Sequence, residues 1–266
     1  MNILDTIAAY AGERVAYAKK SKPLVQIKAE ALAMDCRTGF PFEKALTEPG
    51  ISFICECKKA SPSKGLIAEQ FPYVEIAKAY EEAGAACISV LTEPKWFLGS
   101  NDYLREIAGT VSIPCIRKDF TVDEYMIYEA KTLGASAVLL ICALLPTERI
   151  REYIGICDTL GLSAVVEAHD EAEVSSAAAA GARIIGVNNR NLKDFTVDIH
   201  NSERLRTYAP KDTLFIAESG IQSHEDIRVL EAGGVNGVLI GETLMRARDK
   251  KAMLQYLRGE IPAYGE

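Results

Sequence analysis

Residues 81–91 read EEAGAACISVL, and this order of residues decides the fold. The first part ends a pattern typical of a helix, and Gly84 stands where a left-handed residue commonly terminates one. The second part, residues 87–91, is a short apolar run of the kind found in buried strands. A helix, a glycine and an apolar strand in this order form the repeating unit of α/β proteins.

The same unit recurs along most of the chain, with glycines before apolar runs again at Gly134, Gly181 and Gly233. The expected strands span residues 51–56, 87–91, 113–117, 137–141, 163–166, 184–187, 213–217 and 237–240. The expected helices span residues 73–82, 103–108, 123–133, 147–160, 171–180, 202–208, 225–232 and 247–257. Strands that are almost wholly apolar and separated by helices pair in parallel, with both faces covered.

Eight such units predict an α/β fold, a (β/α)8 TIM barrel with an N-terminal helical extension. An open, doubly wound sheet is the alternative, but no Gly-x-Gly-x-x-Gly follows the first strand, and eight near-equal units favour closure. We expect a single domain over residues 1–266, with the extension at 1–50 and the barrel at 51–266. Amphipathic stretches at 3–19 and 24–34 predict two added helices, either a structural cap or part of a lid over the substrate.

Composition and charge narrow the class of protein. Of 266 residues, 48 % are hydrophobic and 25 % charged, which suits one large core and excludes a disordered chain. The formal net charge of -7 argues against a nucleic-acid or anionic-lipid partner. The longest apolar stretch, residues 137–145, is less than half of the roughly 20 residues that span a membrane. We therefore expect no membrane partner, and the polar start of the chain predicts a cytoplasmic protein.

The cysteines and histidines give little support to a metal site. Cys55 and Cys57 form a Cys-x-Cys pair, but no second close pair exists among the seven cysteines, and the chain has only three histidines. Cysteines inside apolar runs behave as small hydrophobic residues. We expect no bound metal.

Charged and amide side chains stand where the apolar runs stop, and in barrel enzymes the active site lies at these carboxyl ends of the strands. Glu56 and Lys58 are two residues apart, so both point to the same side of their strand. The polar residues expected at this mouth are Glu56, Lys58, Lys118, Glu167, Asn188, Arg190, Glu218 and Ser219. Each could merely solvate a strand end, but together they would shift one another's pKa values and supply acids and bases.

Glycines follow the last two strands, where barrels frequently bind phosphate. Gly220 ends one run and Gly241 the next, and helical sequence follows each of them. Without a side chain, the backbone can approach an anion closely. The pair predicts a phosphate site, unless the glycines serve only as turns.

Residues 56–65, ECKKASPSKG, closely resemble a signature of the indole-3-glycerol phosphate synthase family. Five further motifs follow in the order and spacing of that family: LTEPKWFLGS at 91–100, RKDF at 117–120, NNRNL at 188–192, AESGI at 217–221 and LIGE at 239–242. The resemblance runs from the N-terminal extension to about Met245. Such a set in register is far more specific than any single glycine or lysine.

The resemblance implies an enzyme of tryptophan biosynthesis. Such an enzyme converts 1-(2-carboxyphenylamino)-1-deoxyribulose 5-phosphate into indole-3-glycerol phosphate, releases carbon dioxide and water, and needs no cofactor. By the same resemblance, Lys118 is the acid that protonates the substrate carbonyl during ring closure, and its charge lies near the developing oxyanion. Lys58 and Glu167 match the acid and base of the later steps, and Glu56 keeps the lysines charged and oriented.

The resemblance also implies the groups that hold the substrate. Asn188, Glu218 and Ser219 match positions that hydrogen-bond its hydroxyls and the catalytic groups, and Phe97 and Phe120 match the apolar slot for its anthranilate ring. The remaining binding positions are Ser61, Arg190, Gly220, Gly241 and Glu242. Since a carboxylate repels phosphate, we expect the Glu242 backbone N–H to bind and its side chain to turn outward.

Two other functions stay open from the residues alone. One is another sugar-phosphate barrel enzyme, an isomerase or an aldolase that uses Lys118 as a Schiff-base nucleophile. The other is a catalytically silent barrel that binds or assembles, against which the intact Lys118 and Glu167 argue. We expect a small phosphorylated substrate as the partner, and a monomer or weak homodimer.

Overall fold

The computed structural model describes residues 3–191 and 195–264, and its strands close into a barrel. The barrel strands that these residues form are β1 (Ser52–Cys57), β4 (Cys87–Leu91), β5 (Cys115–Lys118), β6 (Ala137–Ile141), β7 (Ser163–Ala168), β8 (Ile184–Asn188), β9 (Leu214–Glu218) and β10 (Gly237–Ile240). They follow one another around the ring in this order, β10 pairs with β1, and all pairs are parallel. The prediction of a (β/α)8 TIM barrel is confirmed.

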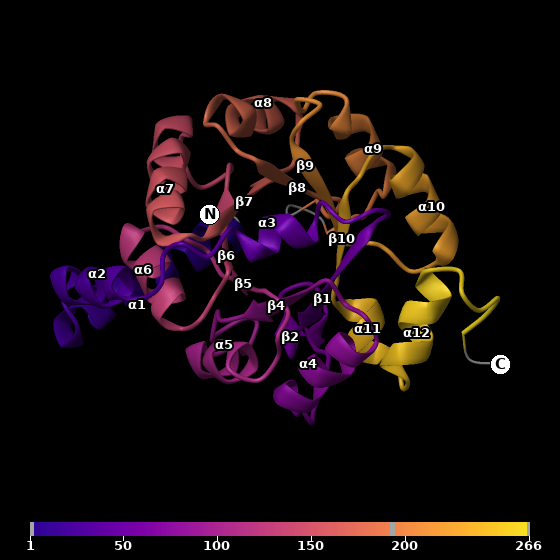
Figure 1. Ribbon diagram of the computed structural model, residues 1–266, viewed down its shortest axis with the longest axis horizontal. Helices are drawn as coiled ribbons and strands as arrows, with labels where there is room; N and C mark the ends of the chain where they lie inside the picture. Colours follow the sequence, from indigo (N-terminus) through magenta and orange to yellow (C-terminus); the bar gives the residue numbers. More distant parts are fainter. Residues whose placement is uncertain (1–2, 192–194, 265–266) are drawn as a thin grey trace.

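Helices alternate with these strands and lie outside the ring (Figure 1). They are α4 (Tyr73–Glu82), α5 (Asn101–Ala108), α6 (Glu124–Thr132), α7 (Thr147–Leu160), α8 (Glu171–Ala179), α9 (His200–Arg206), α10 (His224–Ala232) and α12 (Lys250–Leu257). Local sequence sets their ends. Asp123 and Asp170 accept hydrogen bonds from first-turn amides of α6 and α8, and Gly161 ends α7 with a φ of 67°.

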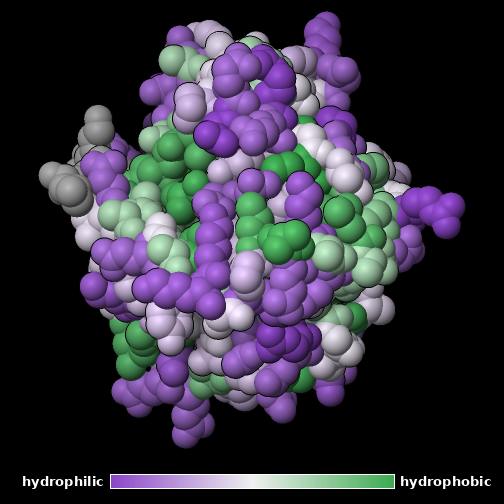
Figure 2. Space-filling model, turned by 90° about the vertical axis from the view of Figure 1, so that its left-hand side faces the viewer, coloured by the Kyte–Doolittle hydropathy of each residue, from purple (hydrophilic) through white to green (hydrophobic). Residues whose placement is uncertain are grey.

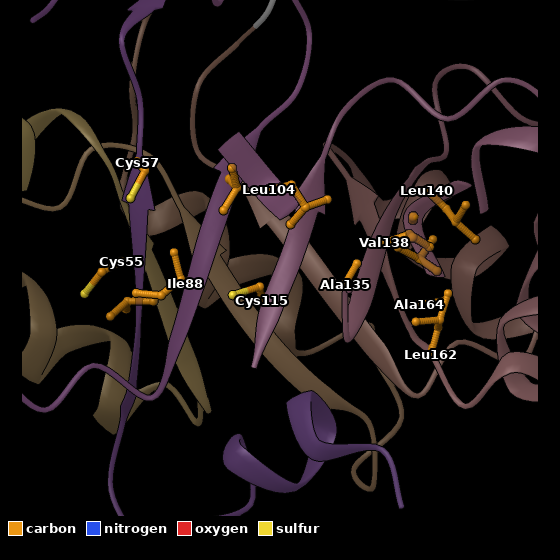
Figure 3. Close-up of a cluster of buried hydrophobic side chains, with 14 of the residues drawn as sticks. Cys55, Cys57, Ile88, Leu104, Cys115, Ala135, Val138, Leu140, Leu162 and Ala164 are labelled. Carbon is orange, nitrogen blue, oxygen red and sulfur yellow. The ribbon is translucent and has the colours of Figure 1, made fainter. Parts of the chain in front are cut away.

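Alternation along the strands builds two apolar layers. Ile54 and Ile116 point into the barrel, whereas their neighbours Cys55 and Cys115 point outward to the helices. Figure 3 shows part of the outer layer, with Cys55 and Cys57 on the same side of β1. Two residues after Ile54 or Ile116, the strand again points into the barrel, and this position lies at the carboxyl end of the strand. Polar residues stand there.

The N-terminal extension covers both ends of the barrel with α1 (Ile3–Ser21), α2 (Leu24–Ala33) and α3 (Pro41–Ala45). In Figure 1, α3 lies across the middle of the ring, and its Phe42 packs on the inner core residues. Ser52 at the start of β1 donates a hydrogen bond to the carbonyl of Ala45, so α3 covers the amino ends of the strands. At the opposite end, Leu4 and Ile7 of α1 line a cavity. The extension thus contains a structural cap, α3, and a wall of the cavity, α1.

The sequence did not predict four short elements. They are β2 (Ala60–Ser61), β3 (Gly65–Leu66), α3 and α11 (Glu242–Arg246). Segments of two to five residues are too short to show a hydrophobic period. Five of the eight strands also have other bounds than predicted, by one residue for β1, β8 and β9 and by up to two for β5 and β7. β5 begins at Cys115, after Pro114, which has no N–H to donate, and β7 continues to Ala168, so Glu167 lies within the strand.

The described helices are too short or too polar to cross a membrane. Figure 2 shows the face that lies on the left in Figure 1, where α1, α2, α6 and α7 are found. Hydrophilic side chains separate the apolar areas on this face. Apolar surface divided in this way is ordinary for a globular protein.

Replacing Phe42 with alanine is expected to lower the free energy of unfolding by about 3–5 kcal/mol. The side chain is 0 % exposed, so the change leaves a cavity beneath the barrel. Urea unfolding followed by circular dichroism measures the loss. Tyr208→Ala is the control, because Tyr208 is 47 % exposed, and its effect should stay within about 0.5 kcal/mol. Equal losses in the two variants would contradict the packing of α3.

Candidate active site

A cavity of about 830 Å³ opens at the carboxyl ends of the barrel strands, a volume that suits a small organic substrate. All the site residues expected from the sequence line it: Glu56, Lys58, Ser61, Phe97, Lys118, Phe120, Glu167, Asn188, Arg190, Glu218, Ser219, Gly220, Gly241 and Glu242. Strand alternation explains why the charged groups meet. Lys118 follows the inward-facing Ile116 by two residues, and Glu167 follows Val165 in the same way.

Lys118 belongs to a buried cluster of charges. Its Nζ lies 2.5 Å from Oε2 of Glu218 and 3.1 Å from Oε2 of Glu167. Burial disfavours the charged ammonium, but the carboxylates of Glu218, Glu167 and Glu56 outweigh burial and raise the pKa of Lys118 above its usual range. Lys118 is therefore an ammonium at neutral pH.

The two carboxylates beside Lys118 have different proton affinities. Burial favours the protonated form of Glu167, but Lys118 and His169 outweigh burial and lower the pKa of Glu167 below its usual range. Burial, together with the neighbouring Glu167, raises the pKa of Glu218 to about 7 despite the charge of Lys118. Glu167 is therefore ionised at neutral pH, whereas Glu218 gains or loses a proton there.

A second ion pair lies at the end of β1. The Nζ of Lys58 lies 2.6 Å from Oε1 of Glu56, as the spacing of two residues predicts. Ser89 donates a hydrogen bond of 3.3 Å to the other oxygen of Glu56. A Cβ at Gly241 would lie 2.4 Å from Oε1 of Glu56 and 2.7 Å from Nζ of Lys58. The ion pair can therefore lie against the backbone after β10 only because residue 241 is glycine.

Glycine and asparagine shape the ends of β8 and β9. A Cβ at Gly186 would lie 2.5 Å from Oε1 of Glu218, so this carboxylate needs a glycine beside it. Ser219 has a φ of 70° and Gly220 a φ of 86°, both in the left-handed region. The side chain of Asn189 donates to the carbonyl of Ser219 at 3.2 Å. Asn189 thus supports an unusual backbone conformation at the wall of the cavity.

Two further predicted residues make hydrogen bonds within the protein, and a third is buried. The Oδ1 of Asn188 accepts a hydrogen bond of 3.0 Å from the backbone N–H of Arg190. The guanidinium of Arg190 donates to the carbonyl of Phe195 at 3.3 Å. Ser61 is buried in β2. Leu192, the last residue of the NNRNL motif, lies outside the described residues.

The backbone N–H groups just before α10 donate to a side chain of the same chain. The carboxylate of Asp226 accepts hydrogen bonds of 2.8 Å from the N–H groups of Gln222 and Ser223, and Ser223 completes a capping box. The N–H groups of Gln222 and Ser223 are therefore already occupied by Asp226.

The carboxylate of Glu242 is directed to two cations. It lies 3.1 Å from Nε of Arg246 and 3.5 Å from Nζ of Lys64, whose side chains are half-exposed. These cations offset the negative charge of Glu242 at the cavity. The side chain of Glu242 thus forms ion pairs at the cavity rather than turning freely into solvent.

Phe97 and Phe120 form an apolar part of the cavity, with ring centroids 5.9 Å apart. Buried polar contacts fix the loop that carries Phe97. The carboxylate of Glu93, which is 0 % exposed, accepts hydrogen bonds from the N–H groups of Trp96 at 2.7 Å and Phe97 at 3.0 Å. These hydrogen bonds tie the loop that carries Phe97 to a buried side chain.

His169 stands among the polar residues at the end of the fifth predicted strand, but the predicted site residues include neither His169 nor Glu173. The Nε2 of His169 lies 3.2 Å from Oε1 of Glu167, and its Nδ1 lies 2.9 Å from Oε2 of Glu173. A signal for the first contact exists, because the two-residue spacing that pairs Glu56 with Lys58 also pairs Glu167 with His169.

Sequence reasoning also missed a clamp between the extension and the barrel. Arg14 of α1 donates to both oxygens of Asp119, at distances of 3.0 and 2.7 Å. Thr92 donates to the same buried carboxylate at 2.5 Å. Because Asp119 follows Lys118 directly, the clamp ties α1 to the strand end that carries the central ammonium.

The seven cysteines, all within the described residues, are free thiols that lie buried or half-buried. Burial raises the pKa of Cys55, which keeps its thiol protonated. Across residues 3–191 and 195–264, no group of three or more His, Cys, Asp or Glu side chains is arranged to hold a metal ion. The cysteines are packing residues.

Comparisons with known proteins match nearly the whole chain. The family model described as indole-3-glycerol phosphate synthase matches residues 4–257. The indole-3-glycerol phosphate synthase of Ruminiclostridium cellulolyticum is 58 % identical over 257 residues, which cover 97 % of this chain and 99 % of that protein. The indole-3-glycerol phosphate synthase of Lachnoclostridium phytofermentans is 51 % identical, over 96 % of this chain and 98 % of that protein.

Among solved structures, a 3-hexulose-6-phosphate synthase superposes with a TM-score of 0.62 at 14 % identity, over 79 % of this chain and 100 % of that one. Similarity at this identity shows the fold alone. Sequence identity above 50 % over nearly the full length shows the family as well as the fold. The chain therefore belongs to the indole-3-glycerol phosphate synthase family, carboxy-lyases of tryptophan biosynthesis that form indole-3-glycerol phosphate.

Proposed function

We propose that the cluster around Lys118 catalyses ring closure, and that the other walls of the cavity hold 1-(2-carboxyphenylamino)-1-deoxyribulose 5-phosphate. The observation that carries this proposal is the buried ammonium of Lys118, which lies between Glu167 and Glu218 at the carboxyl ends of the strands. Acid and base both come from side chains, so the mechanism uses no cofactor. Substituting Lys118 and following the fluorescence of the indole product tests the assignment.

In ring closure, an aromatic carbon of the substrate attacks the carbonyl carbon, and negative charge develops on the carbonyl oxygen. The ammonium of Lys118 stabilises this oxygen and gives it a proton. Glu218, with a pKa of about 7, is placed to return a proton to Lys118. An aldolase would need Lys118 as a neutral amine, which its raised pKa disfavours.

The later steps need a second acid and a base. After carbon dioxide leaves, a hydroxyl group departs and the ring nitrogen loses a proton. Glu167 is ionised and takes that proton as the base. Lys58, which lies 2.6 Å from Glu56, serves as the acid for the departing hydroxyl.

Different parts of the cavity hold the two ends of the substrate, its aromatic ring and its phosphate. Phe97 and Phe120 enclose the anthranilate ring. The phosphate lies against the backbones of Gly220 and Gly241 and beside Lys58. The remaining binding residues are Ser61, Asn188, Arg190, Ser219 and Glu242. Such positioning brings the reacting atoms together before proton transfer.

Gly241→Ala is expected to raise KM by about tenfold or more, because the new methyl group would displace Lys58 from the phosphate end. Inorganic phosphate should compete with the substrate in the wild type and more weakly in the variant. Steady-state kinetics at several phosphate concentrations measure both effects. Gly155→Ala is the control, since a Cβ at Gly155 meets no atom within 4 Å. An unchanged KM in Gly241→Ala, or no competition in the wild type, would remove the phosphate assignment.

We also place the enzyme in the cytoplasm and expect a monomer or weak homodimer. Seven free thiols persist in a reducing compartment. The net charge of -7 gives no basis for a nucleic-acid partner.

A further inference from the structure

A chain of charged groups continues from the catalytic cluster to the start of α8. Glu167 uses Oε2 to contact Lys118 at 3.1 Å and Oε1 to contact Nε2 of His169 at 3.2 Å. The other ring nitrogen of His169, Nδ1, lies 2.9 Å from Oε2 of Glu173. The same oxygen of Glu173 accepts a hydrogen bond of 2.8 Å from the backbone N–H of His169. His169 is thus fixed at two points by Glu173 and faces Glu167.

We propose that His169, oriented by Glu173, is a positioning residue for the reaction: it holds Oε1 of Glu167 so that Oε2 faces Lys118 and the reacting centre. The inference deepens the proposed function, because it rests on Glu167 as the base. A base oriented by a third group is a recurring arrangement in enzymes.

Electrostatics gives His169 a second effect on Glu167. Burial favours the neutral imidazole, but Glu167 and Glu173 outweigh burial and raise the pKa of His169 to about 10. The ring is therefore an imidazolium at neutral pH. Its positive charge supports that of Lys118 in keeping Glu167 ionised, so Glu167 stays a base at pH values where an isolated buried glutamate would be protonated.

The groups around Glu167 and His169 come from three elements, β5, β9 and α8, and from the turn after β6. Lys118 lies on β5, Glu218 on β9 and Glu173 on α8, and all three contact the chain of charges directly. The remaining titratable neighbours are Asp170, the N-cap of α8, and Cys142 after β6, whose thiol donates to the carbonyl of Glu173. Burial raises the pKa of Cys142, so this thiol is neutral in the range considered.

His169→Asn tests the proposal. Asparagine keeps a polar side chain but carries no charge, so kcat/KM at pH 7 should fall by about tenfold to a hundredfold. The loss should fall on kcat and leave KM nearly unchanged, because His169 positions the base and does not line the substrate cavity. The matched control is His200→Asn, since His200 also contacts a glutamate, Glu203, but is exposed on α9. His200→Asn should keep the wild-type kcat and KM.

Two further measurements separate positioning from folding. In a Glu167→Gln background, His169→Asn should cause little additional loss, because a residue that acts through Glu167 has nothing left to act on. Nitrogen-15 NMR titration of the imidazole should find His169 protonated up to about pH 10 in the wild type. In Glu173→Gln, which retains an oxygen for the backbone N–H, the ring should lose its proton at lower pH.

The outcomes distinguish this inference from the function on which it rests. A wild-type kcat in His169→Asn, with Glu167→Gln inactive, would overturn the role of His169 and leave Glu167 as the base. Full additivity of the two substitutions would also overturn it, since that result marks a purely structural residue. Wild-type turnover in Glu167→Gln would instead overturn the assignment of the base itself.

Discussion

Replacing Lys118 with alanine is expected to lower the rate of indole-3-glycerol phosphate formation by about 10³-fold or more. The substitution removes both the proton donor and the positive charge that meets the developing oxyanion. It also takes away the cation that lies 3.1 Å from Glu167 and 2.5 Å from Glu218. Steady-state fluorescence of the indole product measures the rate.

The control for this variant is its stability as a function of pH. In the wild type the pKa of Glu167 is lower in the folded protein than in the unfolded chain. Ionised Glu167 therefore stabilises the fold at pH values above the ordinary glutamate pKa. This stabilisation is lost as the pH falls through the pKa that Glu167 has in the folded protein. Lys118→Ala should therefore lose most stability at neutral and higher pH and least in acid.

Lys211→Ala, at an exposed position, should match the wild type in rate and stability. Near wild-type turnover in folded Lys118→Ala would contradict its role as the acid.

Glu167→Gln is expected to lower turnover by about 10²- to 10⁴-fold. Glutamine has nearly the same size but cannot accept the ring-nitrogen proton, and Lys118 keeps Glu218 as a partner. Because the base acts after decarboxylation, carbon dioxide should be released faster than the indole product forms. Parallel measurement of both products in a single turnover checks this order.

The matched control for the base is Glu171→Gln, on the exposed surface at the start of α8. It should leave both product rates unchanged. Equal slowing of carbon dioxide release and indole formation in Glu167→Gln would place the lost step at or before decarboxylation. That result would contradict the assignment of Glu167 to the final proton removal.

The fold was predictable because local signals repeat. The order seen in residues 81–91, a helix end, Gly84 and an apolar strand, needs no knowledge of distant contacts. Eight repeats then leave few topologies. By contrast, α3 has only five residues, and what makes it a cap is the burial of Phe42 under strands that come later in the chain. Tertiary packing of this kind leaves no period in the sequence.

In the candidate site, contacts between residues two positions apart on one strand were predictable, because such residues point to the same side. The spacing of two residues places Glu56 beside Lys58, and the structure confirms that contact at 2.6 Å. The same rule extends to His169 beside Glu167, but its second partner, Glu173, comes from the next helix. The clamp of Arg14 on Asp119 joins residues 105 positions apart, and only the folded barrel brings them together.

The measurement that tests the central claim most directly is the fluorescence of indole formation after the purified protein meets 1-(2-carboxyphenylamino)-1-deoxyribulose 5-phosphate in the presence of a metal chelator. Catalysis by the side chains of the cavity predicts a prompt rise without added cofactor, and no comparable rise from Lys118→Ala. The absence of a rise from folded wild-type protein, or an equal rise from the variant, would contradict the claim that Lys118 and its carboxylates close the indole ring.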